Sequence, residues 1–163
     1  MFQHQPATGS DDPERERIEQ LEAALRASEA RYRSLFEDNQ SIMLLIDTES
    51  AMIVDANSAA AAFYGWTREQ LRTMRVTAID VYAEAEIGAE FARAKAEGRN
   101  FVALQHRRAD GSIRDVEVYT SAVVLDGRTM AYAIVQDVTQ RKRAEEALRR
   151  SEESLRESQA VAH

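Results

Sequence analysis

Two Asp-Gly pairs, Asp110-Gly111 and Asp126-Gly127, restrict the fold of this chain more than any other feature of its sequence. Asp-Gly is among the pairs most favoured in tight turns between antiparallel strands. The two pairs separate three strand-like runs: 101–108, 113–125 and 128–138. In the middle run, apolar or small residues alternate with more polar ones from Val116 to Val124, as in a strand with one buried face. This part of the chain therefore predicts three successive antiparallel strands.

Two shorter strand-like runs come earlier, at Ser41–Asp47 and Ala51–Asp55. The stretch between these runs and the later ones favours helices: 58–64 with Asn57 as N-cap, a capping box at 67–70, and 83–97 ended by Gly98. Two strands, several helices and three strands, in this order, predict an α+β fold. We expect a five-stranded antiparallel sheet with short helices on one face.

Helix-forming segments flank this middle region. Residues 13–37 follow a good N-cap, Asp12, and contain no Gly or Pro after Pro13. Apolar residues recur there at spacings of three and four, the period of a helix–helix contact: Ile18, Leu21, Leu25, Tyr32 and Leu35. In 139–163, Leu148 and Leu155 share one heptad position. We expect two amphipathic coiled-coil helices that dimerise the chain; for the first, packing on its own domain is the alternative.

Charge and composition exclude several classes of function. The net charge is −7, which argues against a nucleic-acid partner, and there is no cysteine for a disulfide, a thiolate metal site, a nucleophile or cysteinyl-flavin photochemistry. The six glycines form no nucleotide-binding spacing, and no Ser–His–Asp group can be placed. We expect no catalytic residue, no metal site and no enzymatic activity. Without an apolar run of about 20 residues or a signal peptide, we also expect a cytoplasmic chain with no membrane partner.

Four segments, in order along the chain, resemble the PAS domain family: 29–37, 53–57 followed by 64–71, 106–112, and 137–142. The resemblance covers about three quarters of the chain, from Glu29 to Arg150. It implies a sensory module, usually dimeric, that belongs to a bacterial sensor histidine kinase or a cyclic-dinucleotide enzyme such as a diguanylate cyclase. Such a module passes a conformational change through its flanking helices. The output domain would be supplied by a longer parent protein or a partner.

The composition, the helix patterns and this resemblance together divide the chain into four segments: a disordered tail over 1–12, an N-terminal signalling and dimerisation helix over 13–37, a PAS core over 38–138, and a C-terminal signalling helix over 139–163. The tail assignment also rests on its polar, non-periodic composition.

The resemblance further implies that a small ligand can be held between the sheet and the helices. The candidate wall residues are Met43, Leu45, Asn57, Phe63, Phe91, Phe101 and Leu104. The apolar ones equally suit an ordinary core, and helix capping alone explains Asn57. Haem is not expected, because haem-binding members carry a histidine on the longest helix and 83–97 has none. Non-covalent flavin stays open, and His106 is expected at the surface or hydrogen-bonded near a hairpin.

We expect the signal to leave through Asp137 and Thr139, with Thr139 capping the last helix and Asp137 close to its positive end. Arg107 or Arg114 is the expected partner of Asp137. The basic residues 141–143 oppose the helix dipole, so this junction is expected to be marginally stable and to act as a two-state element. The rival function is a ligand-free scaffold for dimerisation and protein interaction.

Overall fold

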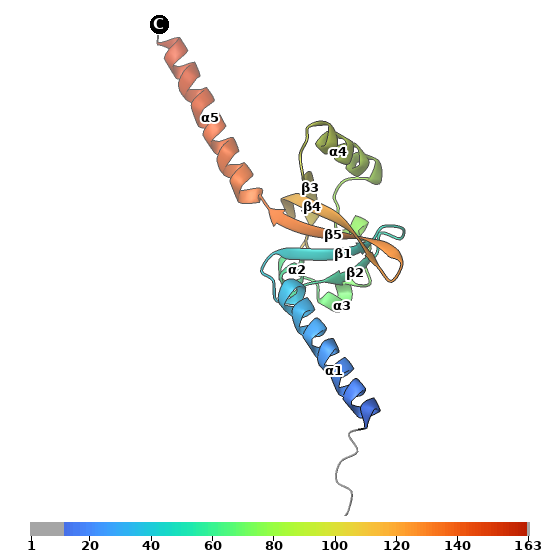
Figure 1. Ribbon diagram of the computed structural model, residues 1–163. Coiled ribbons are helices and arrows are strands. Elements are labelled where there is room, and N and C mark those ends of the chain that lie inside the picture. Colours follow the sequence, from blue (N-terminus) through green and yellow to red (C-terminus); the bar gives the residue numbers. More distant parts are fainter. Residues whose placement is uncertain (1–11, 163) are drawn as a thin grey trace, which may run out of the picture.

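The computed structural model describes residues 12–162, and its centre is one five-stranded sheet (Figure 1). The strands, in chain order, are β1 Ile42–Asp47, β2 Ile53–Ala56, β3 Val102–Arg107, β4 Ile113–Leu125 and β5 Arg128–Asp137. In space the order is β2-β1-β5-β4-β3, and every neighbouring pair is antiparallel. The two groups of strands join where β1 pairs with β5, and the predicted α+β fold with its five-stranded antiparallel sheet is confirmed.

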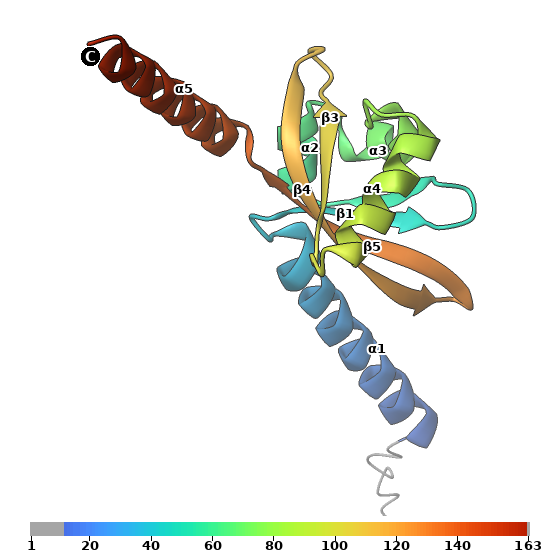
Figure 2. The same cartoon turned by 90° about the horizontal axis from the view of Figure 1, so that it is seen from above.

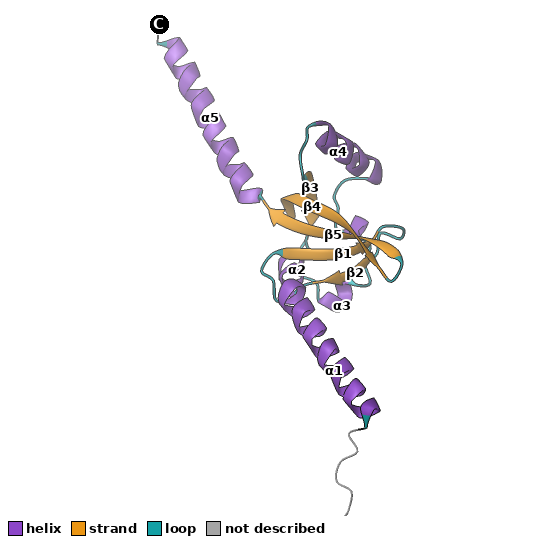
Figure 3. Ribbon diagram, viewed as in Figure 1, coloured by secondary structure: helices purple, strands orange, loops and turns teal. Residues whose placement is uncertain are grey.

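The helices connect the two groups of strands or flank the sheet (Figure 3). They are α1 Pro13–Tyr32, α2 Ser58–Tyr64, α3 Arg68–Leu71, α4 Glu84–Ala96 and α5 Thr139–Val161, with a π-helical turn over Arg33–Glu37 and a 3-10 turn over Val76–Ala78. The main core joins one face of the sheet to the helices between β2 and β3. Leu44, Val116 and Val135 contribute from the strands, and Tyr64 and Leu71 from the helices.

The turn between β4 and β5 has the geometry that the sequence predicts. Asp126 and Gly127 have φ angles of 50° and 72°, both in the left-handed region that a two-residue type I′ hairpin requires. Asp110-Gly111 instead lies within a five-residue connection from β3 to β4, where Gly111 alone has a positive φ, 83°. Both pairs therefore reverse the chain between antiparallel strands, by turns of different length.

The register of β1 against β5 decides which side chains face the helices. Leu44 lies opposite Ala133, and Met43 lies opposite Ile134. Because successive side chains of a strand point to opposite faces, Leu44 faces the main core and Met43 faces away from it. Met43 is buried on that second face, where the Tyr132 hydroxyl lies 3.0 Å from its sulfur.

The two long helices, α1 and α5, project from the core in different directions (Figures 1 and 2). Asp12 caps α1 by accepting a hydrogen bond from the Glu14 N–H at 3.2 Å, and the rest of the predicted tail lies outside the described residues. No residue of α1 is buried. The seam residues are all exposed: Ile18, Leu21, Leu25, Tyr32 and Leu35 on α1 and the turn that follows it, and Leu148 and Leu155 on α5. From Ile18 to Leu25 the seam of α1 therefore does not pack on its own core.

Candidate functional site

An apolar cavity of about 240 Å³ lies between the sheet and α4. Its wall includes Leu44, Ile46, Asp47, Thr48, Ala51, Val76, Asp80, Ile87, Phe91, Val102, Leu104, His106, Val118, Thr120, Ala131, Ala133 and Val135. Small residues on β4 and β5, among them Thr120, Ala131 and Ala133, leave the space that larger side chains would fill. Phe91 is 44% exposed, so the wall reaches the surface at α4.

Of the seven predicted pocket residues, the structure places Phe91 and Leu104 at this cavity. Met43 and Leu45 point to the other face of the sheet, because the cavity side of β1 is formed by Leu44 and Ile46. The sequence shows five consecutive apolar residues there and does not distinguish the two faces.

Two further candidates are also displaced from the cavity. Phe101 packs against Tyr119, with ring centroids 5.7 Å apart, and Phe63 lies under the Arg108 guanidinium, 5.4 Å from its ring centroid. Both positions correct the expectation that these rings line the cavity, because neither belongs to its wall.

Asn57, the remaining candidate, is a structural clamp. Its side-chain oxygen accepts hydrogen bonds from the N–H groups of Ala60, which confirms the predicted cap of α2, and of Met43, at 3.0 and 3.1 Å. Its amide nitrogen lies within hydrogen-bond distance of three backbone oxygens, those of Phe36, Asn39 and Ser41. Asn57 is fully buried, and its polar atoms are all engaged with the protein, so it has no group left to offer a ligand.

A buried polar chain forms one end of the cavity. The Tyr64 hydroxyl lies 2.9 Å from His106 Nδ1, and His106 Nε2 lies 3.1 Å from Asp80 Oδ1. Burial, with the nearby negative charge of Asp80, raises the pKa of the Tyr64 hydroxyl, so this group stays protonated. His106 is 2% exposed and hydrogen-bonded to Tyr64, so it takes the hydrogen-bonded one of the two expected positions.

Sequence reasoning missed this chain of groups. Tyr64 ends α2, Asp80 follows the 3-10 turn, and His106 lies on β3. An isolated bridge between the backbones of Asp80 and His106 brings the last two together. No local spacing connects three residues that lie 16 and more positions apart, so only the tertiary structure reveals them.

The predicted signal junction is held by a network around Asp137. Arg114 donates to Asp137 Oδ2 from Nε and Nη2, at 2.9 and 2.8 Å. Thr139 donates to Asp137 Oδ1 from its backbone N–H at 3.0 Å and from its hydroxyl at 2.6 Å. Burial acts to raise the pKa of the Asp137 carboxyl, but these hydrogen bonds and the Arg114 charge outweigh it and lower the pKa below its usual value. Of the two arginines considered, Arg114 is therefore the partner.

Thr139 does not cap α5, contrary to the expectation. It is the first residue of the helix, and its hydroxyl accepts a hydrogen bond from the Asp115 N–H at 2.9 Å, which ties the helix to β4. Asp137 supplies the side-chain oxygen that receives the Thr139 N–H at the start of α5.

The expected conflict between basic residues and the α5 dipole is largely relieved by the strands. Arg141 forms an ion pair with Glu117, and Lys142 Nζ lies 3.9 Å from Asp115 Oδ1. Both acidic partners lie on β4, so the same contacts that offset the positive charge also attach the helix to the sheet.

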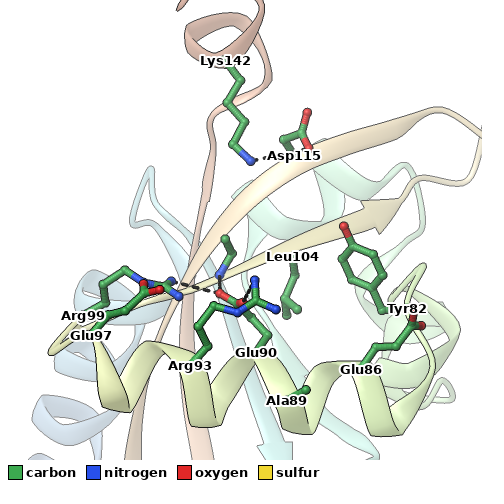
Figure 4. Close-up of a pocket in the computed structure, with 11 residues that line it drawn as sticks. Tyr82, Glu86, Ala89, Glu90, Arg93, Glu97, Arg99, Leu104, Asp115 and Lys142 are labelled. Atoms are coloured by element: carbon green, nitrogen blue, oxygen red, sulfur yellow. Dashed lines mark hydrogen bonds and ion pairs between the residues drawn. The ribbon is translucent and has the colours of Figure 1, made fainter.

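A second, polar groove of about 530 Å³ runs between α4 and the start of α5 (Figure 4). Arg93 and Arg99 converge there on Glu90, and Lys142 points toward Asp115 at the other end (Figure 4). Glu90 also accepts the Ala103 N–H at 3.0 Å, a hydrogen bond that lowers its pKa. The groove is lined by four carboxylates and three cationic side chains, most of them paired with one another, and these pairs attach α4 to the start of β3.

A third cluster, also missed from the sequence, anchors the end of α1. The Tyr32 hydroxyl donates to Asp55 at 2.5 Å, and Arg68 donates two hydrogen bonds of 2.8 Å to the same carboxylate and pairs with Glu37. The Tyr32 ring also stacks on Phe36, with centroids 5.2 Å apart. Tyr32, predicted only as a seam residue, therefore joins α1 to β2 and α3.

Residues 12–162 contain neither a candidate metal centre nor a candidate membrane-spanning helix. Their histidine and acidic side chains form no group of three suited to hold a metal ion. None of their helices combines the length and the apolar character needed to cross a lipid bilayer.

The sequence matches the family model of the PAS domain over residues 39–140. It is similar to the diguanylate cyclase DgcM of Escherichia coli (strain K12), with 34% identity over 128 residues that cover 76% of this chain and 30% of that protein. It is also similar to the sensor histidine kinase TmoS of Ectopseudomonas mendocina, with 27% identity over 86% of this chain and 15% of the kinase. The chain thus spans less than a third of the length of these relatives.

Among solved structures, the PAS domain of the HTR-like protein from Haloarcula marismortui has the same fold. The TM-score is 0.59 at 22% identity, over 73% of this chain and 98% of that one. The matched family model, the strand order and the helices on one face agree, and this chain belongs to the PAS family of sensory domains that serve signal transduction.

Proposed function

We propose that this PAS domain senses a small molecule in its apolar cavity and passes the resulting change through α5 to an output domain. The observation that carries the proposal is that β4 and β5 form both the cavity wall and the α5 junction. Ala131, Ala133 and Val135 of β5 line the cavity, and Asp137 follows on the same face of the strand. A ligand that displaces β5 would therefore displace Asp137.

The junction is suited to transmit such a movement. Asp137 binds Arg114 and Thr139, and Thr139 binds the backbone of Asp115. These hydrogen bonds connect two strands and the first turn of α5. A small change in the strand positions alters several of them together, which favours two arrangements of the helix over a gradual bend.

The relatives support an output domain of the kinase or cyclase class. DgcM and TmoS are named as a diguanylate cyclase and a sensor histidine kinase, and this chain corresponds to less than a third of either. In this proposal the chain is itself non-catalytic, and α5 leads to the output domain of a parent protein or partner.

Dimerisation is the second part of the proposal. Leu21, Leu25 and Leu148 are each about 60% exposed on helices that project from the core. Leucines at heptad spacing on a projecting helix favour a contact with a second copy, which buries them. The same observation also favours the alternative function, a scaffold that dimerises and binds no ligand.

Native mass spectrometry of the purified chain distinguishes the two functions. A dimer that retains an extra small molecule on each chain supports sensing. A dimer at bare chain mass, which stays bare when candidate ligands are added, supports the scaffold.

Hydrogen exchange tests the relay. In Asp137→Ala we expect exchange in the first turns of α5 to rise at least tenfold, with the core strands β1 and β5 changing by less than threefold. Asp110→Ala, on an exposed hairpin, is the matched control and should leave α5 unchanged. Equal acceleration in the core and α5 would contradict a role in coupling and assign Asp137 to general stability.

A further inference from the structure

We propose that the cavity takes an uncharged or cationic molecule with an apolar body and one N–H or O–H group, and that this group donates a hydrogen bond to Asp80. The inference rests on the proposed ligand-sensing function and names the class of ligand.

One carboxylate oxygen at the cavity has no hydrogen-bond partner among the described residues. Asp80 lines the cavity, and its side chain is only 6% exposed. Among residues 12–162, Asp80 Oδ1 has no hydrogen-bond partner. His106 Nε2 approaches it to 3.1 Å, within ion-pair distance but without the alignment of a hydrogen bond. A buried carboxylate oxygen in this state is costly, and a ligand that donates to it removes the cost.

The other polar groups at this end of the cavity leave Asp80 as the available acceptor. The Tyr64 hydroxyl and His106 Nδ1 lie 2.9 Å apart and engage each other, whereas His106 Nε2 is not aligned for a hydrogen bond with Asp80 Oδ1. The carboxylate is then the acceptor that remains at this end of the cavity. A ligand oxygen with only lone pairs would meet the negative charge of Asp80, whereas an N–H or O–H group would be attracted to it.

The remaining wall of the cavity is mostly apolar. Leu44, Ile87, Phe91 and Val118 are typical of it, and no Lys or Arg of the described chain lines the cavity. An anionic ligand such as a phosphate or a carboxylate would be buried without a counter-charge. An apolar cavity of about 150 Å³ can hold a benzene molecule, so about 240 Å³ has room for one ring with a substituent.

The experiment compares probes of equal shape. Phenol and aniline each carry a donor on a single ring, and fluorobenzene has nearly the same shape without one. Their dissociation constants for the whole chain are measured by NMR titration at a pH near 7. We expect both donors to bind at least about tenfold more tightly than fluorobenzene, the ratio typical of a hydrogen bond to a charged group.

Asp80→Asn is nearly isosteric and removes the charge, so the donor preference should fall below about threefold. Asp126→Asn, the same change on an exposed turn, should preserve it. The wild-type ratio needs no variant, so the test remains decisive even if Asp80→Asn fails to fold.

The outcomes separate the two proposals. If all three probes bind with similar affinity and Ala133→Leu, which fills the cavity, abolishes binding, the sensing function stands and the role of Asp80 is overturned. If no probe binds, or if Ala133→Leu leaves binding unchanged, the cavity is not the binding site and both proposals fail.

Discussion

Buried polar residues of this domain are of two kinds, and the difference is visible atom by atom. Asn57 engages both its oxygen and its nitrogen with backbone groups of four segments of the chain. Asp80 is nearly as buried but leaves Oδ1 without a hydrogen bond among residues 12–162. A satisfied polar group stabilises one structure, whereas an unsatisfied group beside a cavity favours a ligand.

The first prediction concerns the satisfied group. Asn57→Ala should lower the free energy of unfolding by about 2–4 kcal/mol, because buried N–H and carbonyl groups lose their partner and α2 loses its cap. Urea denaturation followed by circular dichroism measures the change. Asn100→Ala, at an exposed loop position, is the control and should change stability by less than about 0.5 kcal/mol. Similar losses in the two variants would contradict the clamp role of Asn57.

The second prediction is a pH dependence at the junction. Since the pKa of Asp137 is lower in the folded chain than in the unfolded one, its contribution to stability is fully present above the unfolded value of about 3.9. It is lost as the pH falls from there through the folded pKa. NMR of the Thr139 amide between pH 6 and pH 2.5 should show this transition, and Asp137→Asn should abolish it. A transition that persists in Asp137→Asn belongs to another carboxylate.

At the scale of elements, short helices are positioned by their ends. The Thr67–Gln70 capping box, predicted from the sequence, is present at the start of α3. Gly65 ends α2 in the left-handed conformation, at φ 83°. The Ala109 N–H donates a hydrogen bond of 2.7 Å to the backbone carbonyl oxygen of Tyr64, the residue just before Gly65. The β3–β4 connection is therefore held against the end of α2.

Glycine substitutions test this close approach. In Gly65→Ala the new Cβ would lie 3.2 Å from the Ala109 Cβ, in addition to the strain of the left-handed backbone. We expect a loss of at least about 1–2 kcal/mol in the free energy of unfolding. Gly88→Ala, inside α4 with open space around it, should gain about 0.5–1 kcal/mol. Thermal and urea unfolding measure both changes. If Gly65→Ala leaves the free energy of unfolding unchanged, the β3–β4 connection moves away to make room for the new methyl group.

At the scale of the whole molecule, the domain is a core with two projecting helices whose leucines are exposed (Figure 1). The core is buried by its own residues, whereas the leucines of the two projecting helices are exposed to solvent. We infer that a second copy covers the seam of α1, and that the positions of the two α5 helices in the dimer carry the signal onward.

The corresponding prediction is that a charge in the α1 seam converts the dimer to monomers, which halves the mass measured in solution. Leu25→Asp should weaken the dimer at least about a hundredfold, because two leucines, each worth about 1.5–3 kcal/mol when buried, are replaced by charges. Ala23→Asp, on the opposite side of α1, should leave the dimer intact. Sedimentation velocity over a range of concentrations measures both. A dimer that survives Leu25→Asp would place the interface elsewhere and remove α1 from the mechanism.

Local features of the sequence determined much of this protein. The Asp126-Gly127 turn, the cap at Asn57 and the pairing of Asp137 with Thr139 depend on residues within a few positions of one another. Such short-range geometry is nearly the same in any fold, so the strands, the helices and their order can be read directly.

Only the tertiary structure decided which face of each strand lines the cavity and which residues form the candidate ligand site. The alignment of β1 with β5 turned Leu44, rather than Met43, toward the cavity, since a shift by one residue exchanges the faces of a strand. Likewise, folding brought Asp80 and His106 together from separate elements. Long-range register and packing set these contacts, and no local pattern encodes them, which is why the candidate ligand site emerged only from the folded chain.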